Sequence, residues 1–424
     1  KESTFFERVF NKKQYSLIKK DISLTELNKL RSVGDPAIKL HRSKKRVYPQ
    51  HNIFSNLIGL KTNELISKIE KNMNKELAEG KNLKLTVDLR IQNIVREELY
   101  KSLIEYKAKA ALAVVMNVKS GEIFSMVSLP DFNPNYPKSI LPKTESNLNA
   151  EARYEMGSTL KIFNAAMVYE SKSEIQFNEF EISDGYQITN EKHILDDHID
   201  KKILNFDDVF VKSSNIGSVK ILESFGPNKQ KQFFKKVGLT ENLEIEGLNV
   251  VSNKLPINWE SHSKFISYGY GLSLSPISLI TAFSSLVNGG FKIQPTLIKN
   301  KINQKEVKVF SSETSKKINE LIHKIVMDGT GKKAQVTGLL IGGKTGTSKK
   351  VENGNYSEEK KITSFIGIFP ATSPEFLTFV LFDEPQKNAV NSKETTGGNT
   401  AAPTFSKIVK KISPIITKNN YSRN

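Results

Sequence analysis

Two pairs of apolar segments, one in the first third of the chain and one near its end, constrain the fold most strongly. Residues 112–118 and 122–128 flank Lys119-Ser-Gly121, and residues 361–369 and 376–382 flank a turn bounded by prolines. Short apolar runs on either side of a glycine- or proline-containing turn are typical of β-hairpins. Because most of the chain lies between the two pairs, we expect one antiparallel sheet with a long insertion between its hairpins.

Helical patterns accompany these strands. Apolar residues recur at helical spacing from Ile91 to Ile104 after Asp88, and a terminal helix is expected from near Ala401 to Ile412. The insertion between the hairpins is largely helical in pattern. This order of elements predicts an α/β (α+β) fold, in which helices flank an antiparallel sheet and a helical subdomain is inserted.

The first 84 residues form a separate, charged region. Ser23-Leu-Thr-Glu26 is a capping box that opens a short helix, and the helix should stop at Gly34-Asp-Pro36. A basic segment follows, and the region has too little apolar content for a large core. We therefore expect an N-terminal region over residues 1–84, a main domain over residues 85–418 and a tail over residues 419–424.

Charge and composition exclude several classes of protein. The chain has 424 residues and a formal net charge of +18, from 63 Lys+Arg against 45 Asp+Glu. Such a surplus of positive charge favours an anionic binding partner. Nucleic acid is disfavoured as that partner, because the basic residues are spread along the chain and there is no zinc-finger spacing or RNP motif. The absence of cysteine excludes disulfides and thiolate metal sites.

No transmembrane segment is evident. The longest apolar run, residues 110–116, is far shorter than the ~20 residues that span a bilayer, so we expect the chain itself to be soluble. Because it begins at Lys1 without an initiator methionine, we also expect a signal or membrane anchor upstream.

Three short motifs carry the chemistry. Ser158 and Lys161 form a Ser-x-x-Lys pair, which alone is uninformative because the spacing recurs three times elsewhere in this lysine-rich chain. Downstream, however, lie Ser213-Ser-Asn215 and then residues 344–347, Lys-Thr-Gly-Thr. This ordered triple is the signature of penicillin-binding proteins and serine β-lactamases.

The first motif suits a nucleophile and its base. Ser158 needs a base to remove its proton, and residues three apart on a helix face the same way, so Lys161 can reach it. Burial and a second cation, Lys344, would lower the pKa of Lys161 so that its amine is neutral. The simpler interpretation is that Ser158 only caps the helix that follows, and a position at a helix N-terminus would also favour an oxyanion.

The other two motifs suit proton relay and substrate binding. Ser213 can pass a proton to the leaving amine, and Asn215 can hold Lys161 and the substrate backbone. The hydroxyls of Thr345 and Thr347 can bind a carboxylate, while Gly346 permits close approach of a substrate backbone. The backbone N–H groups of Ser158 and Thr347 would form the oxyanion hole.

Beyond these motifs the chain resembles class B penicillin-binding proteins, the monofunctional peptidoglycan D,D-transpeptidases. The resemblance covers roughly residues 83–412, and residues 46–49 with Ile69-Glu70 are similar to parts of the family's N-terminal pedestal. Residues 267–273 resemble the cell-division (septal) branch. Further segments that resemble the family are residues 83–92, 128–135, 329–331 and 396–405. The chain departs from the pattern in having Met156 where proline is usual, and in a much shorter pedestal.

The resemblance implies a penicillin-binding fold and a serine acyl-enzyme formed on stem peptides ending in D-Ala-D-Ala. It also implies acylation by β-lactam antibiotics, a catalytic domain in the periplasm anchored to the inner membrane, a membrane glycan polymerase and division proteins as partners, and no cofactor. Tyr268 and Tyr270 are possible substrate contacts, although packed framework is an equal alternative.

Other functions stay open. The same fold could support hydrolysis, as in a D,D-carboxypeptidase or a β-lactamase, or serve as a penicillin-binding sensor or scaffold. His193, His198 and Asp200 suggest a metal site, but two histidines five apart share no helical or strand face, so we expect a charged loop and no metal there.

Overall fold

The computed structural model describes residues 17–42, 46–60, 68–137, 140, 144–190, 192–196, 198–299, 307–352, 354–386 and 394–421. Contacts divide the chain into two units, residues 1–47 and residues 48–424. The domain boundary expected after residue 84 stays a prediction.

The first unit contains the helix α2, Leu24–Val33. The Ser23 hydroxyl accepts a hydrogen bond from Glu26 N, the Glu26 carboxylate accepts one from Ser23 N at 2.8 Å, and Gly34 ends the helix at φ 66°. The predicted capping box and helix end are therefore confirmed.

The second unit begins with segments that resemble the pedestal. Three short helices follow one another here: α3, Ser55–Ile58; α4, Lys68–Asn72; and α5, Asn74–Ala78. The Tyr48 hydroxyl donates to the Glu70 carboxylate at 2.9 Å, and both side chains are buried. Two segments that are apart in sequence thus meet before the main fold begins.

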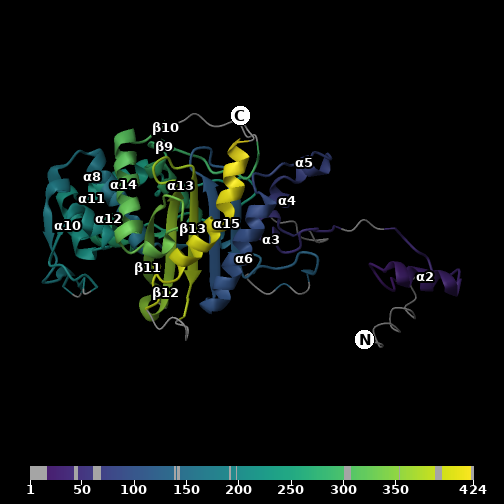
Figure 1. The fold of residues 1–424 in the computed structure, drawn as a ribbon. Coiled ribbons are helices and arrows are strands. Elements are labelled where there is room, and N and C mark those ends of the chain that lie inside the picture. The colour runs from purple at the N-terminus through teal and green to yellow at the C-terminus, as the bar shows by residue number, and fades with distance from the viewer. Residues whose placement is uncertain are drawn as a thin grey trace. The chain divides into compact units, whose positions relative to one another are not determined.

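A five-stranded antiparallel sheet forms the centre of this unit, in the order β11-β12-β13-β1-β2 (Figure 1). The strands are β1, Ala110–Asn117; β2, Ile123–Leu129; β11, Gly342–Glu352; β12, Asn355–Phe369; and β13, Phe376–Asp383. Both predicted hairpins are confirmed, and β1 pairs with β13 so that Val114 lies opposite Phe379. β11, which carries the Lys-Thr-Gly-Thr motif, is an edge strand and continues past the motif to Glu352.

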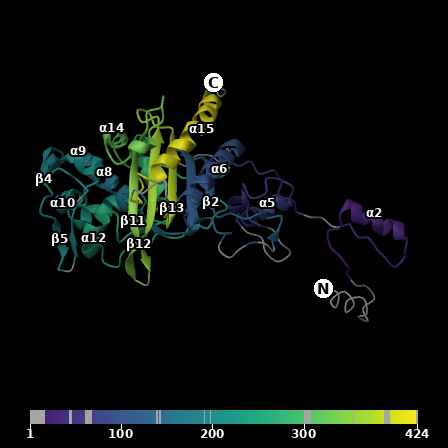
Figure 2. The same cartoon turned by 60° about the horizontal axis from the view of Figure 1, so that its bottom comes forward.

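Alternate residues of β1 face two separate apolar cores, because side chains alternate across a strand. Ala111, Ala113 and Val115 pack with α6, Leu89–Glu105, and α15, Ala401–Tyr421. Figure 2 shows both helices beside the β13-β1-β2 side of the sheet. The two predicted helices are confirmed, but α15 is longer than expected and continues through Pro414.

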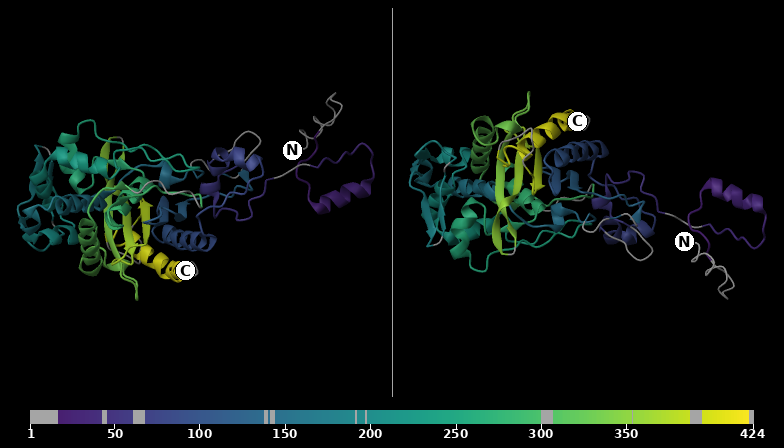
Figure 3. Two further views of the ribbon diagram at one scale, coloured as in Figure 1. Left: turned by 90° about the horizontal axis from the view of Figure 1, so that it is seen from above. Right: turned by 90° about the horizontal axis from the view of Figure 1, so that it is seen from below.

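The other face of the sheet packs against the helical subdomain, which gathers at one end of the unit in Figure 3. Its helices are α7, Leu148–Glu151; α8, Lys161–Glu170; α9, Phe206–Val211; α10, Asn215–Phe225; α11, Pro227–Lys236; α12, Trp259–Tyr268; α13, Pro276–Val287; and α14, Ser312–Asp328. The 3-10 turns are η2, Gly157–Leu160; η3, Glu174–Phe177; and η4, Lys332–Ala334.

Small two-stranded sheets complete the second unit. Their strands are β3, Tyr154–Glu155; β4, Glu179–Glu181; β5, Tyr186–Thr189; β6, Lys192–Ile194; β7, Ile203–Asn205; β8, Ser273–Leu274; β9, Phe291–Lys292; and β10, Val307–Lys308. Throughout the described ranges, no helix is both long and apolar enough to cross a membrane.

Candidate active site

Ser158 lies in the 3-10 turn η2, which leads directly into α8. The N-cap of the turn is Met156, and the N-cap of α8 is Leu160. The interpretation of Ser158 as a helix cap is therefore wrong. Neither N-cap makes a side-chain cap hydrogen bond, and the Thr159 hydroxyl donates to Met156 O at 2.9 Å. The Ser158 side chain is half-buried at the start of this helical segment.

Two glycines let the turn sit directly against β11. Gly157 has φ +55°, and a Cβ there would lie 2.5 Å from Thr347 O. A Cβ at Gly346 would lie 2.6 Å from Met156 O. The nucleophile turn thus approaches Gly346 closely, and the approach of a substrate backbone at Gly346 stays a prediction. This contact places Ser158 beside the Lys-Thr-Gly-Thr strand.

Lys161 is fully buried at the first turn of α8. Its Nζ donates to Asn215 Oδ1 at 2.8 Å, to Ser213 Oγ at 3.3 Å and to the Ser213 carbonyl. Within the described part of the chain no hydrogen bond joins Lys161 to Ser158. Burial lowers the pKa of Lys161 to about 7, while the negative charge of Asp196 opposes the shift. A large fraction of its amine is therefore neutral near pH 7.

Lys344 enters the same cluster from β11 and is also fully buried. Its Nζ donates to Ser213 Oγ at 2.9 Å. Burial, followed by repulsion from Lys161, holds the pKa of Lys344 well below its ordinary value. The Ser213 hydroxyl thus lies between two buried amines, as a proton relay requires.

The turn between α9 and α10 presents Ser213 and Asn215 to these amines. Ser213 has φ 66°, a left-handed conformation that is uncommon for a side-chain-bearing residue. Ser214 caps α10, because its hydroxyl accepts from Gly217 N at 2.8 Å. The middle residue of the motif therefore builds the turn, and its two neighbours face the lysines.

Asp196 is a residue of the site that sequence reasoning missed. Its carboxylate accepts hydrogen bonds from the Ser214 hydroxyl, from Asn215 N at 2.9 Å and from Ile216 N at 3.1 Å. It lies in a loop as predicted, but it is buried, which the prediction of a charged loop did not include. No local sequence signal marks it, because its partners lie about 20 positions downstream. No metal-ligand cluster is present among the residues that the structure describes.

Thr345 and Thr347 lie on the other side of β11 from Lys344. Thr345 Oγ1 lies 2.7 Å from Thr330 Oγ1, and Thr347 Oγ1 accepts from Gly397 N at 3.0 Å. Thr330 and Gly397 belong to segments that resemble the family, but no contact with the Lys-Thr-Gly-Thr motif was predicted for them from the sequence. Thr345 is buried, whereas Thr347 is half-buried at the edge of the site.

Tyr268 and Tyr270 support the loop beside the nucleophile turn. Gly157 N donates to Gly269 O at 3.1 Å, so the tyrosines flank a residue that is bonded to this turn. Tyr268 is buried against Tyr270, with ring centroids 5.5 Å apart. The Tyr270 hydroxyl accepts from Lys349 N at 3.2 Å. These contacts are those of framework residues, and a contact with substrate stays a prediction.

Met156, the departure from the family pattern, is buried in the main core. The preceding residue, Glu155, accepts hydrogen bonds from Gly271 N at 2.8 Å and from the Tyr356 hydroxyl at 3.1 Å. Burial raises the pKa of the Glu155 carboxyl. The segment that enters the nucleophile turn is therefore fixed by packing and by side-chain hydrogen bonds.

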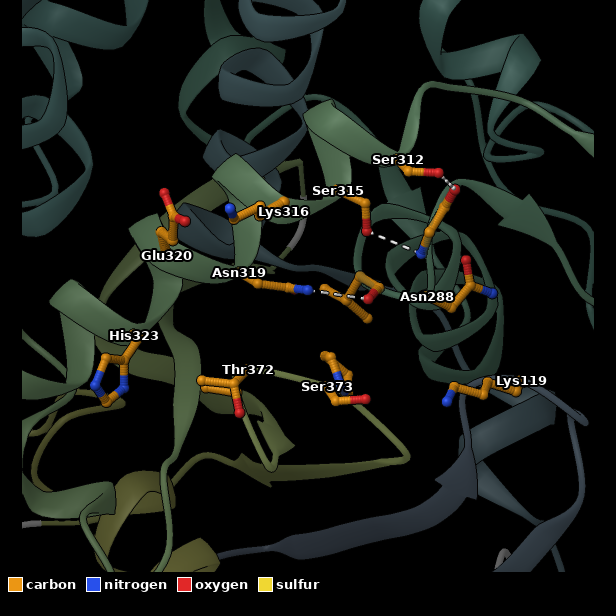
Figure 4. A pocket seen from close by; sticks show the side chains of 14 residues that line it. Lys119, Asn288, Ser312, Ser315, Lys316, Asn319, Glu320, His323, Thr372 and Ser373 are labelled. Carbon is orange, nitrogen blue, oxygen red and sulfur yellow. Dashed lines mark hydrogen bonds between the residues drawn. The ribbon is translucent and has the colours of Figure 1, made fainter.

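A separate cavity of about 380 Å³ lies on another part of the second unit. Figure 4 shows it between α14, the end of α13 and two turns of the sheet, with Lys119, Lys316 and His323 among its lining residues. None of the predicted site residues lines this cavity.

Comparisons with known proteins agree with this arrangement. Residues 111–410 match the family described as the penicillin binding protein transpeptidase domain. The probable peptidoglycan D,D-transpeptidase FtsI of Caulobacter vibrioides is 30% identical over 405 residues, covering 91% of this chain and 68% of the relative. Stage V sporulation protein D of Bacillus subtilis is 32% identical over 350 residues, covering 78% of this chain and 53% of the relative.

Solved structures agree on the fold. The transpeptidase domain of penicillin-binding protein 3 from Burkholderia pseudomallei is 27% identical, with a TM-score of 0.67 over 78% of this chain and 96% of that domain. Penicillin-binding protein 3 from Mycobacterium tuberculosis is 22% identical, with a TM-score of 0.79 over 89% of this chain and 91% of the other.

Proposed function

The chain belongs to the penicillin-binding protein transpeptidase family, and from this premise we propose that it cross-links peptidoglycan stem peptides through an acyl-enzyme on Ser158. The predicted fold class is confirmed, as is the assignment to class B proteins of the division type. The main support for the residue assignment is the position of the Ser213 hydroxyl. It lies 3.3 Å from the buried amine of Lys161 and 2.9 Å from that of Lys344, in a site that also contains the turn of Ser158.

In the acylation step, Ser158 Oγ attacks the carbonyl carbon between the two terminal D-alanines. A C–O ester bond forms and the C–N bond breaks. The Ser158 proton passes to neutral Lys161, whose lowered pKa suits a general base at neutral pH. Ser213 then relays a proton from the lysines to the amine of the departing D-Ala.

Negative charge develops on the carbonyl oxygen of the substrate in the transition state and must be stabilised. We assign the oxyanion hole to the backbone N–H groups of Ser158 and Thr347, and the close contact of Gly157 with the Thr347 backbone supports this assignment. The hydroxyls of Thr345 and Thr347 would bind the substrate carboxylate, and Lys344 would supply positive charge. Asn215 would hold Lys161 on one side and the substrate backbone on the other.

In the second step, an amine of a neighbouring stem peptide attacks the ester, forms the cross-link and releases Ser158. A β-lactam should acylate the same serine, because its ring mimics the D-Ala-D-Ala unit. Hydrolysis is the competing fate of the acyl-enzyme, and the lifetime of the penicilloyl ester distinguishes the two, since turnover within seconds would indicate a hydrolase.

A fluorescent penicillin tests the nucleophile. We expect the wild type to be labelled covalently and Ser158→Ala to lose the label entirely, because the proposed acyl-enzyme forms on the Ser158 hydroxyl. Ser261→Ala is the matched control, since Ser261 and Lys264 have the same spacing on α12 and Ser261 is exposed there. Persistent labelling of Ser158→Ala would contradict the assignment.

The family places the protein in cell-wall synthesis at the cell envelope. We propose further that the catalytic unit lies outside the cytoplasmic membrane, held by an upstream anchor, and works with a membrane glycan polymerase and division proteins. Formation of cross-linked dimer from a lipid-linked precursor, only when such a polymerase is supplied, is the expected result. Equal cross-linking without it would contradict this partnership.

A further inference from the structure

Asp196 lies in the connection between β6 and β7, in a segment to which the proposed chemistry assigns no role. Its side chain is only 6% exposed. Its carboxylate accepts three hydrogen bonds, all from consecutive residues at the start of α10: the Ser214 hydroxyl, Asn215 N and Ile216 N. A carboxylate at a helix N-terminus satisfies N–H groups that the helix itself leaves unpaired.

We propose that Asp196 is a positioning residue for transpeptidation, which fixes the turn of Ser213 and Asn215 and places a negative charge near Lys161. This inference rests on the proposed function. Asp196 does not touch the reacting atoms, and it acts through the residues that do.

The geometric part of the role follows from Asn215. Its backbone N is bound to Asp196 at 2.9 Å, and its side-chain Oδ1 is bound to Lys161 Nζ at 2.8 Å. One residue therefore connects the carboxylate to the buried amine. Loss of the carboxylate would leave buried donors unsatisfied and would release the turn that orients Ser213 between the lysines.

The electrostatic part follows from the charges around Lys161. Among the described residues, two charged groups interact with Lys161. Lys344 repels the ammonium form of Lys161, and Asp196 attracts it. Asp196 therefore raises the pKa of Lys161 against the larger effect of burial. Without that charge the pKa of Lys161 would fall further, which makes the amine a weaker base but keeps it neutral at lower pH.

Asp196→Asn tests both parts through the pH dependence of the acylation rate by a fluorescent penicillin. Because neutral Lys161 is the active form, the wild-type rate should fall as the pH drops through the pKa of Lys161. In Asp196→Asn we expect that fall to occur at lower pH, and the plateau rate to decrease at least ~10-fold. Asp200→Asn is the matched control, because Asp200 is exposed in the same connection, and it should leave both quantities unchanged.

Two charge-preserving variants keep the proposal testable if Asp196→Asn does not fold. Asp196→Glu shifts the carboxylate, and Ser214→Ala removes one of its hydrogen-bond donors, so both should lower the plateau rate. Because both keep the negative charge, the pH at which the rate falls should not change. Wild-type rates in both variants, or an unmoved pH profile in folded Asp196→Asn, would overturn the proposal. Failure of the proposed function itself would appear separately, as absence of labelling in the wild type.

Discussion

Among the individual side chains, Ser213 is the one that joins the three motifs. It receives hydrogen bonds from Lys161 of the first motif and Lys344 of the third, and it belongs to the second. Two buried ammonium groups so close together would repel each other strongly, since the protein interior screens charge poorly. Burial lowers the pKa of both amines, and repulsion from Lys161 lowers that of Lys344 further, so the site favours at least one neutral amine.

The pH dependence of acylation tests the state of Lys161. Its pKa is lowered to about 7, so the neutral fraction falls as the pH drops below that value. We expect the acylation rate to level off above the pKa and to decrease by about tenfold per pH unit well below it. Rate measurements with a fluorescent penicillin across this range provide the check.

Lys161→Arg is the matched variant, because arginine stays protonated at any pH of the experiment. It should lose acylation at every pH by roughly 100-fold or more. A wild-type rate that does not change between acid and neutral pH would contradict a neutral-lysine base.

Among the secondary-structure elements, the contact between η2 and β11 decides whether the site is assembled. β11 is an edge strand, and the nucleophile turn packs closely against it at Gly346. The helix α14 supports β11 from the helical subdomain, where His323 Nδ1 lies 2.7 Å from Ile341 O. The spacing between Ser158 and the strand therefore depends on small residues at the contact.

Gly346→Ala should separate these two elements. The new Cβ would lie 2.4 Å from Ser364 Oγ and 2.6 Å from Met156 O, which is closer than packed atoms approach. The nucleophile turn would therefore have to move away from β11. Because a misplacement of about 1 Å can cost ~100-fold in rate, we expect acylation to fall by that order.

The control for Gly346→Ala is Gly338→Ala. Nothing lies within 4 Å of a Cβ at Gly338, but its φ of +82° makes alanine strained. It should lower the free energy of unfolding by about 1 kcal/mol while leaving the acylation rate intact. Equal rates for wild type and Gly346→Ala would show that the turn and the strand need no close contact.

Among the described residues, the two units of the protein differ in how much apolar surface they bury. The helix α2 of the first unit has no buried residue, whereas the second unit contains both apolar cores. The stability of the catalytic unit should therefore depend on residues 48–424, since burial of apolar surface is the main stabilising contribution.

Removal of residues 1–47 tests this independence. We expect the shortened chain to keep its unfolding midpoint within ~2 °C and to acylate at the wild-type rate. Thermal unfolding followed by circular dichroism, together with labelling by a fluorescent penicillin, gives both readouts. A large drop in the midpoint would show that the first unit contributes to the fold of the second.

Elements whose signals are local could be predicted from the amino-acid sequence. The hairpin of β1 and β2, the helix α6 after Asp88 and the capping box at Ser23 depend on periodicity and on turn and cap residues a few positions apart. The order of the three motifs also lies in the chain itself, and with it the family.

How these parts act together depends on contacts that form only in the folded protein. Burial lowers the pKa values of Lys161 and Lys344, Asp196 holds a turn about 20 positions downstream, and Gly346 admits the nucleophile turn. Desolvation, charge interaction and steric fit depend on distances in space between segments that are remote in sequence, so no local pattern encodes them.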